Sequence, residues 1–367
     1  MARRILIAPD KFKGSLSAPE AAAAIAEGIR RIDPAAELDL CPIADGGEGF
    51  METLAAAMGG EWITCEAVDA LGRPVESKYV LAGKIAVMEM AETAGLWRLS
   101  AEERNPVMAT TRGVGMQMAH AISEHHVDRI IMGIGGSATN DGGVGMASAL
   151  GVFFPDDSEI SVEPNPWGLL GATHVDFSNR LALPEITAAC DVDNPLLGES
   201  GATAVFSGQK GASPEAKITL EMALRNLVAI SGGEEAALIP GAGAAGGLGF
   251  GLMHFTGAKL VSGFDLLADL LKLEDRVTAA SHVVTGEGSI DHQSLSGKGP
   301  VALAKLAARH GIPVTGFCGM TDQAARDSGI FESLHALADS GLPLEKLIAE
   351  AGPLLTTMVA NSNFIQP

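Results

Sequence analysis

Short clusters of glycines, lysines and carboxylates recur along the chain, and most of them follow a run of apolar, strand-like residues. Glycine loops expose backbone N–H groups that bind phosphate or carboxylate groups, and lysine ammonium groups neutralise such anions. A single carboxylate can accept a proton from an alcohol or hold a hydrated magnesium ion. This combination is typical of phosphoryl-transfer enzymes, in which catalysis depends mostly on positioning and charge neutralisation. The clusters cover residues 10–15, 45–49, 133–143, 191–194, 209–211 and 286–299.

The first cluster carries two lysines, Lys11 and Lys13, in a loop that precedes the start of a helical pattern. The N–H groups at a helix N-terminus attract anions, so we predict that Lys13 and Ser15 neutralise a phosphate or carboxylate group. A solvated polar loop explains this segment equally well when it is taken alone, because surface lysines are common.

The longest glycine loop, residues 133–143, follows an apolar strand and contains two hydroxyl side chains. Its glycine spacing resembles a dinucleotide-binding fingerprint only weakly, because no Asp or Glu ends a following strand about twenty residues further on. We predict instead that this loop, together with three residues of other clusters, binds phosphate groups or other oxyanions. The predicted residues are Gly135, Gly136, Ser137, Thr139 and Asn140, with Asn194, Lys210 and Lys298.

Carboxylates at the ends of strand-like runs supply candidates for proton transfer and metal binding. Asp191 is the predicted base or hydroxyl-orienting residue, and Asp45 is the second candidate; a metal ligand and a helix cap are open alternatives for Asp191. Glu287 and Asp291 are the predicted magnesium ligands. A Walker A phosphate loop is excluded, because Lys298 is followed by glycine rather than by Ser or Thr.

Acidic residues outnumber basic ones by 45 to 25, which gives the chain a net charge of -20 at pH 7. This charge argues against nucleic acid and anionic membranes as main partners. Positive charge around an anionic ligand must therefore come from a few local lysines and arginines. The apolar run before Pro9 is too short for an export signal, and glycines interrupt the uncharged stretch 236–258. We therefore expect a cytoplasmic protein with no membrane span.

At both ends of the 367-residue chain, strand-like runs alternate with helical patterns, which is typical of βαβ units and a parallel sheet. Residues 62–90 contain short extended runs that indicate a mixed sheet. We predict two α/β domains: a flavodoxin- or Rossmann-like domain built from residues 1–70 and 281–367, and a mixed-sheet domain inserted as residues 71–280. Since ligands of open parallel sheets bind beyond the carboxyl ends of the strands, we expect the active site in the cleft between these domains.

Read as whole motifs, eight segments resemble the type 1 glycerate kinase family. They are residues 9–18, 44–49, 89–91, 133–151, 189–196, 209–212, 241–247 and 285–298. The resemblance implies phosphorylation of D-glycerate by ATP with Mg²⁺, usually at the 2-hydroxyl to give 2-phosphoglycerate, by a protein with a flavodoxin-like domain and an inserted domain. The chain departs from the family pattern at Lys11, where Ser is frequent, at Ser289, where Arg is common, and at Ser207 and Gly208, where Gly-Pro is common.

Three other activities stay open. A glycerate 3-kinase would give 3-phosphoglycerate from the same substrates. A nicotinamide-dependent hydroxy-acid dehydrogenase would use one of two glycine fingerprints, at 133–138 or at 241–246, as a dinucleotide site, although tight helix packing explains the second equally well. A sugar-acid binding protein would bind glycerate without consuming ATP. The sequence leaves the oligomeric state open.

Overall fold

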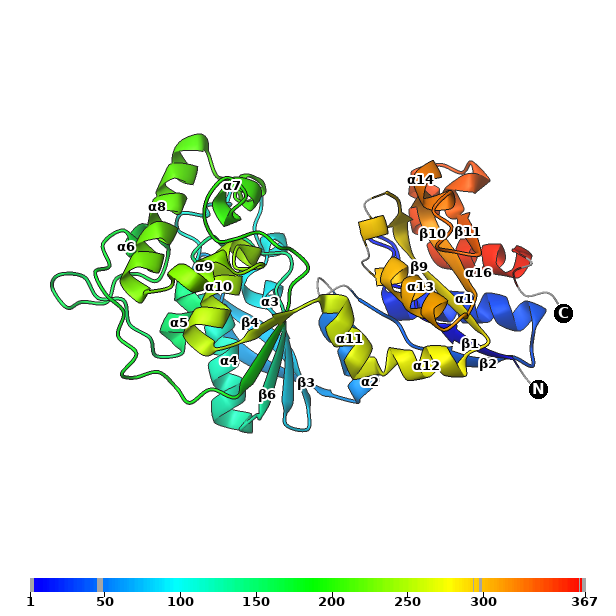
Figure 1. Ribbon diagram of the computed structural model, residues 1–367, viewed down its shortest axis with the longest axis horizontal. Coiled ribbons are helices and arrows are strands. Elements are labelled where there is room, and N and C mark those ends of the chain that lie inside the picture. The colour runs from blue at the N-terminus through cyan, green and yellow to red at the C-terminus, as the bar shows by residue number, and fades with distance from the viewer. Residues whose placement is uncertain (1–2, 45–48, 293, 297–298, 363, 365–367) are drawn as a thin grey trace. The chain divides into compact units, whose positions relative to one another are not determined.

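The protein is described by a computed structural model that covers residues 3–44, 49–292, 294–296, 299–362 and 364. The chain divides into two compact units. Unit 1 combines residues 1–45, 52–57 and 264–367, so the two chain ends, blue and orange to red in Figure 1, build it together. Unit 2 is formed by residues 46–51 and 58–263. The chain passes from one unit to the other around α2 (Phe50–Met58) and at the start of α11 (Gly263–Leu271).

Unit 1 is built on a five-stranded parallel sheet in the order β11-β10-β9-β1-β2. Numbered along this unit alone, the order is 2-1-3-4-5 read from β2, which is the flavodoxin-like arrangement. The strands are β1 (Arg4–Ile7), β2 (Glu37–Leu40), β9 (His282–Ile290), β10 (Val314–Thr321) and β11 (Ser333–Ala336). The helical segments are α1 (Ala18–Ile32), α12 (Leu273–Ala279), η3 (Ser294–Ser296), α13 (Gly299–Arg309), α14 (Gln323–Arg326), η4 (Leu337–Ser340), α15 (Leu344–Ala349) and α16 (Ala351–Asn361).

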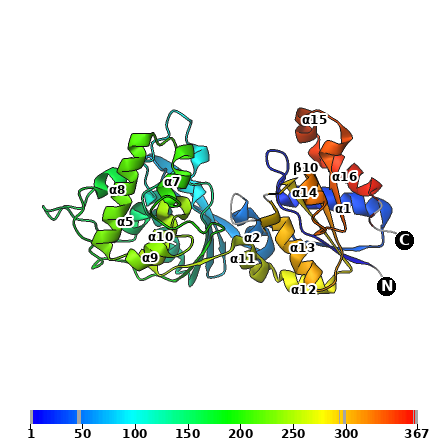
Figure 2. The same ribbon diagram turned by 45° about the horizontal axis from the view of Figure 1, so that its top comes forward.

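Helices cover both faces of this sheet, as a fully buried parallel sheet requires. Ile5 and Ile7 of β1 pack in one cluster with residues of α1 and α16. Leu6 is also fully buried, and it faces the opposite side because successive strand side chains alternate. Figures 1 and 2 show α13 on that side of the sheet and α1 with α16 on the other.

Unit 2 contains a six-stranded mixed sheet in the order β3-β4-β5-β6-β7-β8, antiparallel from β3 to β5 and parallel from β5 to β8. The strands are β3 (Glu61–Val68), β4 (Pro74–Ala82), β5 (Ile85–Glu89), β6 (Arg129–Gly133), β7 (Glu185–Ala189) and β8 (Lys259–Val261). The helical segments are α3 (Ala91–Ala94), η1 (Leu96–Arg98), α4 (Arg112–His125), α5 (Val144–Ala149), α6 (Pro166–Leu169), α7 (Ala202–Phe206), η2 (Gly208–Lys210), α8 (Pro214–Ser231), α9 (Glu234–Leu238) and α10 (Ala244–Thr256). One parallel and one mixed sheet confirm the predicted fold class.

The limits of the units differ from the predicted limits of the domains at residues 46–51, 58–70 and 264–280, and the two longer stretches contain a strand and a helix that explain the difference. Strand β3, which was predicted to belong to the first domain, pairs along its whole length with β4 in the mixed sheet. Helix α12, which was predicted to belong to the inserted domain, packs against β1 and α13 of unit 1. In both places tertiary pairing determines the limit, and the local pattern of the sequence does not show such pairing.

The long uncharged stretch 236–258 is not one helix. It contains the end of α9 and the whole of α10, and the first turn of α10 holds left-handed residues from Ala245 to Gly247. Among the described residues, no helix combines the length and the apolar character that crossing a membrane requires.

Helices α1 and α16 approach closely because Gly28 has no side chain. A Cβ at Gly28 would lie 2.7 Å from the Thr356 carbonyl oxygen and 2.7 Å from the Val359 Cβ. We expect Gly28→Ala to lower the free energy of unfolding by about 1–3 kcal/mol, because α16 must shift. Gly352→Ala in α16 is the control, since the nearest atom there is 3.8 Å away. Urea unfolding of both variants tests this, and equal stabilities would contradict the packing argument.

Candidate functional site

The glycine loop after β6 is held against the segment between α3 and η1. The Leu96 N–H donates to the Gly136 carbonyl, and the Ala138 N–H donates to the Ala94 carbonyl, both at 2.8 Å. Gly136 has φ +73°, a conformation that favours glycine. The N–H groups of residues 135–137 have no hydrogen-bond partner in the part of the chain that the structure describes. Adjacent unpaired N–H groups suit an anion, as the sequence predicted for Gly135, Gly136 and Ser137.

Asp141 fixes the base of this loop from a fully buried position. Its carboxylate accepts hydrogen bonds from the Thr111 N–H at 2.7 Å and the Thr111 hydroxyl at 2.8 Å. It also accepts bonds from the N–H groups of Gly143 and Gly145, each at 3.1 Å. Burial raises the pKa of Asp141, and these four hydrogen bonds oppose that rise. The carboxylate thereby joins the starts of α4 and α5 to the loop.

Lys210 lies beneath the loop and is 1% exposed. Its Nζ donates to the Thr139 carbonyl at 2.6 Å. Burial lowers the pKa of Lys210 to about 7, and the nearby Asp141 carboxylate opposes this shift. Lys210 was predicted to bind phosphate, but in this structure it supports the backbone of the loop.

Thr139 and Asn140, which were also predicted to bind oxyanions, are fully buried. The Asn140 amide donates to the Thr203 hydroxyl at 3.0 Å. The Thr139 hydroxyl and the Asn140 side-chain oxygen have no partner among the described residues. These side chains point inward because residues 138–141 form the inner side of the loop, whereas Gly136 is exposed.

The second glycine cluster, residues 241–247, packs against the first loop. A Cβ at Gly246 would lie 2.0 Å from the Thr139 carbonyl oxygen, and Gly246 has φ +69°. The Gly142 N–H donates to the Gly246 carbonyl at 3.1 Å. Of the two interpretations left open by the sequence, close backbone packing describes this cluster.

The loop after β1 in unit 1 contains Lys13 and Ser15. The Lys13 side chain is exposed, and its N–H has no hydrogen-bond partner within the described ranges. The Ser15 hydroxyl donates to the Phe12 carbonyl at 3.0 Å, which closes the turn. Gly288 of β9 lies against this turn, since a Cβ there would be 2.9 Å from the Lys13 nitrogen. The exposed ammonium and the amide of Lys13 are thus presented by a loop that β9 supports.

Asp191 and Asn194 follow β7 and are both partly exposed. The Asp191 carboxylate accepts a hydrogen bond from the Gly263 N–H at 2.9 Å, at the start of α11. This contact is a helix cap, one of the roles that the sequence left open for Asp191. The Asn194 amide donates to the Ser200 carbonyl at 2.8 Å and closes the turn that follows.

Glu287 on β9 and Asp291 after it, the predicted magnesium ligands, are partly exposed. Asp291 accepts hydrogen bonds from the Ser289 hydroxyl at 3.2 Å and the Ser294 N–H at 3.4 Å. No group of three or more His, Cys, Asp or Glu side chains suited to a metal ion occurs among the described residues. Mg²⁺ usually takes one or two carboxylates plus water and substrate phosphates, so this pair fits that ion chemically. Asp45 and Lys298 lie outside the described residues.

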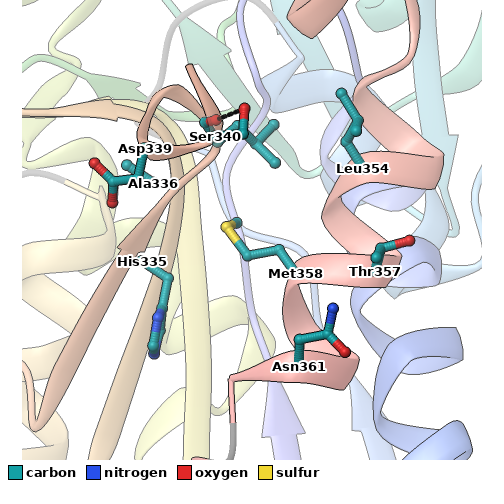
Figure 3. A pocket seen from close by; sticks show the side chains of 9 residues that line it. His335, Ala336, Asp339, Ser340, Leu354, Thr357, Met358 and Asn361 are labelled. Atoms are coloured by element: carbon teal, nitrogen blue, oxygen red, sulfur yellow. Dashed lines mark hydrogen bonds between the residues drawn. The ribbon is translucent and has the colours of Figure 1, made fainter. Parts of the chain in front are cut away.

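A cavity of about 360 Å³ lies in unit 1 (Figure 3). The residues that line it are distant in the sequence from the loops described above. It is lined by His335 of β11, by Asp339 of η4 and by Met358 and Asn361 of α16. None of the predicted site residues that the structure describes lines this cavity.

A sequence model of the glycerate kinase family matches residues 5–364. The chain belongs to the glycerate kinase family. The match confirms the resemblance in the motifs and the prediction of a kinase. A glycerate kinase of Halalkalibacterium halodurans is 40% identical over 368 residues, with 97% of this chain and 96% of that protein covered. A glycerate 2-kinase of Escherichia coli is 41% identical over 335 residues, with 87% and 86% covered.

The fold of this glycerate kinase family member is also found in a solved structure. A crystal structure assigned to glycerate kinase 2 of Salmonella typhimurium LT2 superposes with a TM-score of 0.87 at 37% identity. The alignment covers 99% of this chain and 97% of that chain.

Sequence reasoning did not identify Asp141 as part of the site, although it lies inside the motif 133–151. The sequence signal for a buried Asp141 was its position among small and apolar residues. A carboxylate that is buried there needs several hydrogen-bond donors around it. The whole loop 133–143 was assigned to anion binding, whereas its last glycine, Gly143, donates to Asp141, as does Gly145 just beyond it.

The buried Lys210 makes stability depend on pH in a defined direction. Unfolded, its pKa is 10.5, and folded it is about 7, so between these values only the unfolded state keeps the proton. The free energy of unfolding of the wild type, relative to Lys210→Met, should therefore rise as the pH increases from 7 to 10.

Urea unfolding at several pH values measures this difference. Lys217→Met is the control, because the exposed Lys217 Nζ also contacts a backbone carbonyl, at 3.5 Å from Ala204. The difference in the free energy of unfolding between Lys217→Met and the wild type should not change with pH. A Lys210→Met difference that is constant or falls with pH would contradict the assignment.

Proposed function

We propose that the protein transfers the γ-phosphoryl group of ATP to the 2-hydroxyl of D-glycerate, giving ADP and 2-phosphoglycerate. The observation that carries the proposal is the row of unpaired N–H groups at residues 135–137, held by a buried frame, in a chain of the glycerate kinase family. The 2-position is favoured because one relative at 41% identity is a glycerate 2-kinase.

Each reactant carries negative charge that must be neutralised in a chain with a net charge of -20. In the proposal, the loop 135–137 binds an oxyanion through its N–H groups, and the exposed Lys13 supplies a cation from the turn after β1. Glu287 and Asp291 would hold Mg²⁺, which when bound neutralises phosphate charge. Fixed donors of this kind stabilise charge that develops during transfer.

The chemical step needs a group that accepts the hydroxyl proton. The glycerate oxygen forms a bond to the γ-phosphorus, the bond from that phosphorus to the bridging oxygen breaks, and ADP leaves with the electron pair. Asp191 is the proposed acceptor of the proton, with Asp45 as the second candidate. The cap contact from Gly263 occupies Asp191 Oδ1 and holds the carboxylate in one orientation.

The activity is tested by measuring ADP release with D-glycerate and ATP, followed by phosphorus NMR of the product. We expect ADP release that requires both substrates and a 2-phosphoglycerate signal. A 3-phosphoglycerate signal would show a glycerate 3-kinase. The proposal is wrong if ADP is not released, and reduction of a nicotinamide cofactor with the hydroxy acid would then favour the dehydrogenase.

Asp191→Asn tests the proposed proton acceptor. An amide cannot take up the hydroxyl proton, so kcat should fall by about 100-fold or more while the KM for glycerate changes little. Asp193→Asn is the control, because Asp193 is an exposed carboxylate two residues away. Near-normal turnover by Asp191→Asn would remove Asp191 from this role.

A further inference from the structure

Arg104 lies beside the turn that carries Lys210, although 105 positions separate it from its contact there. Its Nη1 approaches the Gln209 carbonyl at 3.4 Å. Gly211 has φ +94°, and a Cβ at Gly211 would lie 2.8 Å from the Arg104 carbonyl oxygen and 2.9 Å from the Arg104 Cβ. The two segments therefore touch, and the packing fixes Arg104 at this place.

The guanidinium of Arg104 has five N–H donors, and most of them have no acceptor among the described residues. Its Nε is buried and has no hydrogen-bond partner in the described part of the chain. Its one hydrogen bond to the described residues, to Gln209, is long. A buried polar group without a partner is costly, and an acceptor that binds here would relieve that cost.

No carboxylate among the described residues forms an ion pair with Arg104, although two acidic residues precede it in the sequence. Glu103 pairs with Arg73 at 2.6 Å instead. Glu102 is exposed and interacts with Arg104 only at longer range. By contrast, Arg98 of η1 pairs with Glu92 at 3.9 Å. Arg104 thus keeps its positive charge without a paired carboxylate in a strongly acidic chain.

The turn that Arg104 contacts is joined to the glycine loop. The Gln209–Lys210 turn contacts the loop directly, because the Lys210 Nζ donates to the Thr139 carbonyl. The loop follows β6, so the contacts lie beyond the carboxyl end of a parallel strand, where ligands of such sheets bind. The Lys210 side chain is buried and its ammonium donates to the loop backbone, so Arg104 is the cation of this region that can meet a ligand in the proposal below.

We propose that Arg104 binds an anionic group of the reactant that the glycine loop 135–137 holds. This inference rests on the proposed function for the identity of the reactant. A planar guanidinium matches the two oxygens of a carboxylate or phosphate group, which a lysine cannot do. The anion is either the phosphate chain of the nucleotide or the carboxylate of the hydroxy acid.

The test measures binding of tripolyphosphate and of D-glycerate by calorimetry to the wild type and to Arg104→Gln. One of the two ligands should bind to Arg104→Gln at least about tenfold more weakly, because a charge-assisted hydrogen-bond pair is lost. The ligand that is affected identifies the group that Arg104 binds.

Arg180→Gln is the matched control. Its Nη1 also donates to a backbone carbonyl, that of Phe255 at 3.1 Å, and its guanidinium lies 5.8 Å from the Phe177 ring centre. Arg180 precedes β7 and so lies toward the amino end of the strands. Arg180→Gln should bind both ligands as the wild type does.

Arg104→Lys keeps the charge without the planar fork and covers the case in which Arg104→Gln does not fold. Arg104→Lys should bind the same ligand about fivefold or more weakly than the wild type does. Wild-type affinity of either variant for both ligands would overturn the proposal, and so would a wild type that binds neither ligand. If the wild type binds tripolyphosphate through Arg104 but releases no ADP with glycerate, the anion site stands and the proposed function fails.

Discussion

The carboxylate of Asp141 joins Thr111, which lies just before α4 and 30 positions away in the sequence, to the glycine loop and the start of α5. It accepts two hydrogen bonds from Thr111, one from Gly143 of the glycine loop and one from Gly145 of α5, and it lies in the interior, where an unpaired carboxylate would be costly. The shape of the loop follows from this constraint, because the residues that serve Asp141 face inward. Residues 135–137, at the outer side of the same loop, are left with unpaired N–H groups.

The distribution of positive charge follows from the same arrangement. Lys210 lies in the interior near Asp141, where it supports the loop backbone. The cations that we propose to meet a ligand are Lys13 on an exposed turn and Arg104 beside the Lys210 turn. In a chain with 45 acidic residues and 25 basic residues, the proposed binding of anionic reactants depends on these few cations and on the unpaired backbone N–H groups.

Much of this architecture is predictable from the sequence, because β1, β6, β7 and β10 are apolar runs followed by polar loops. The short edge strand β11 is not predictable in this way, since only one of its four residues is buried and its apolar pattern is weak. The Gln-Lys-Gly turn gives no local sign that Lys210 points inward, because α7 and the glycine loop bury it. Arg104 was missed because its partner Gln209 is far away in the sequence.

The most direct test of this account is a crystal structure of the protein with D-glycerate and a non-hydrolysable ATP analogue. We expect ligand oxygens within about 3.2 Å of the N–H groups of residues 135–137, with Asp141 keeping its four hydrogen bonds. It would be contradicted if both ligands were well ordered and no ligand oxygen approached these N–H groups.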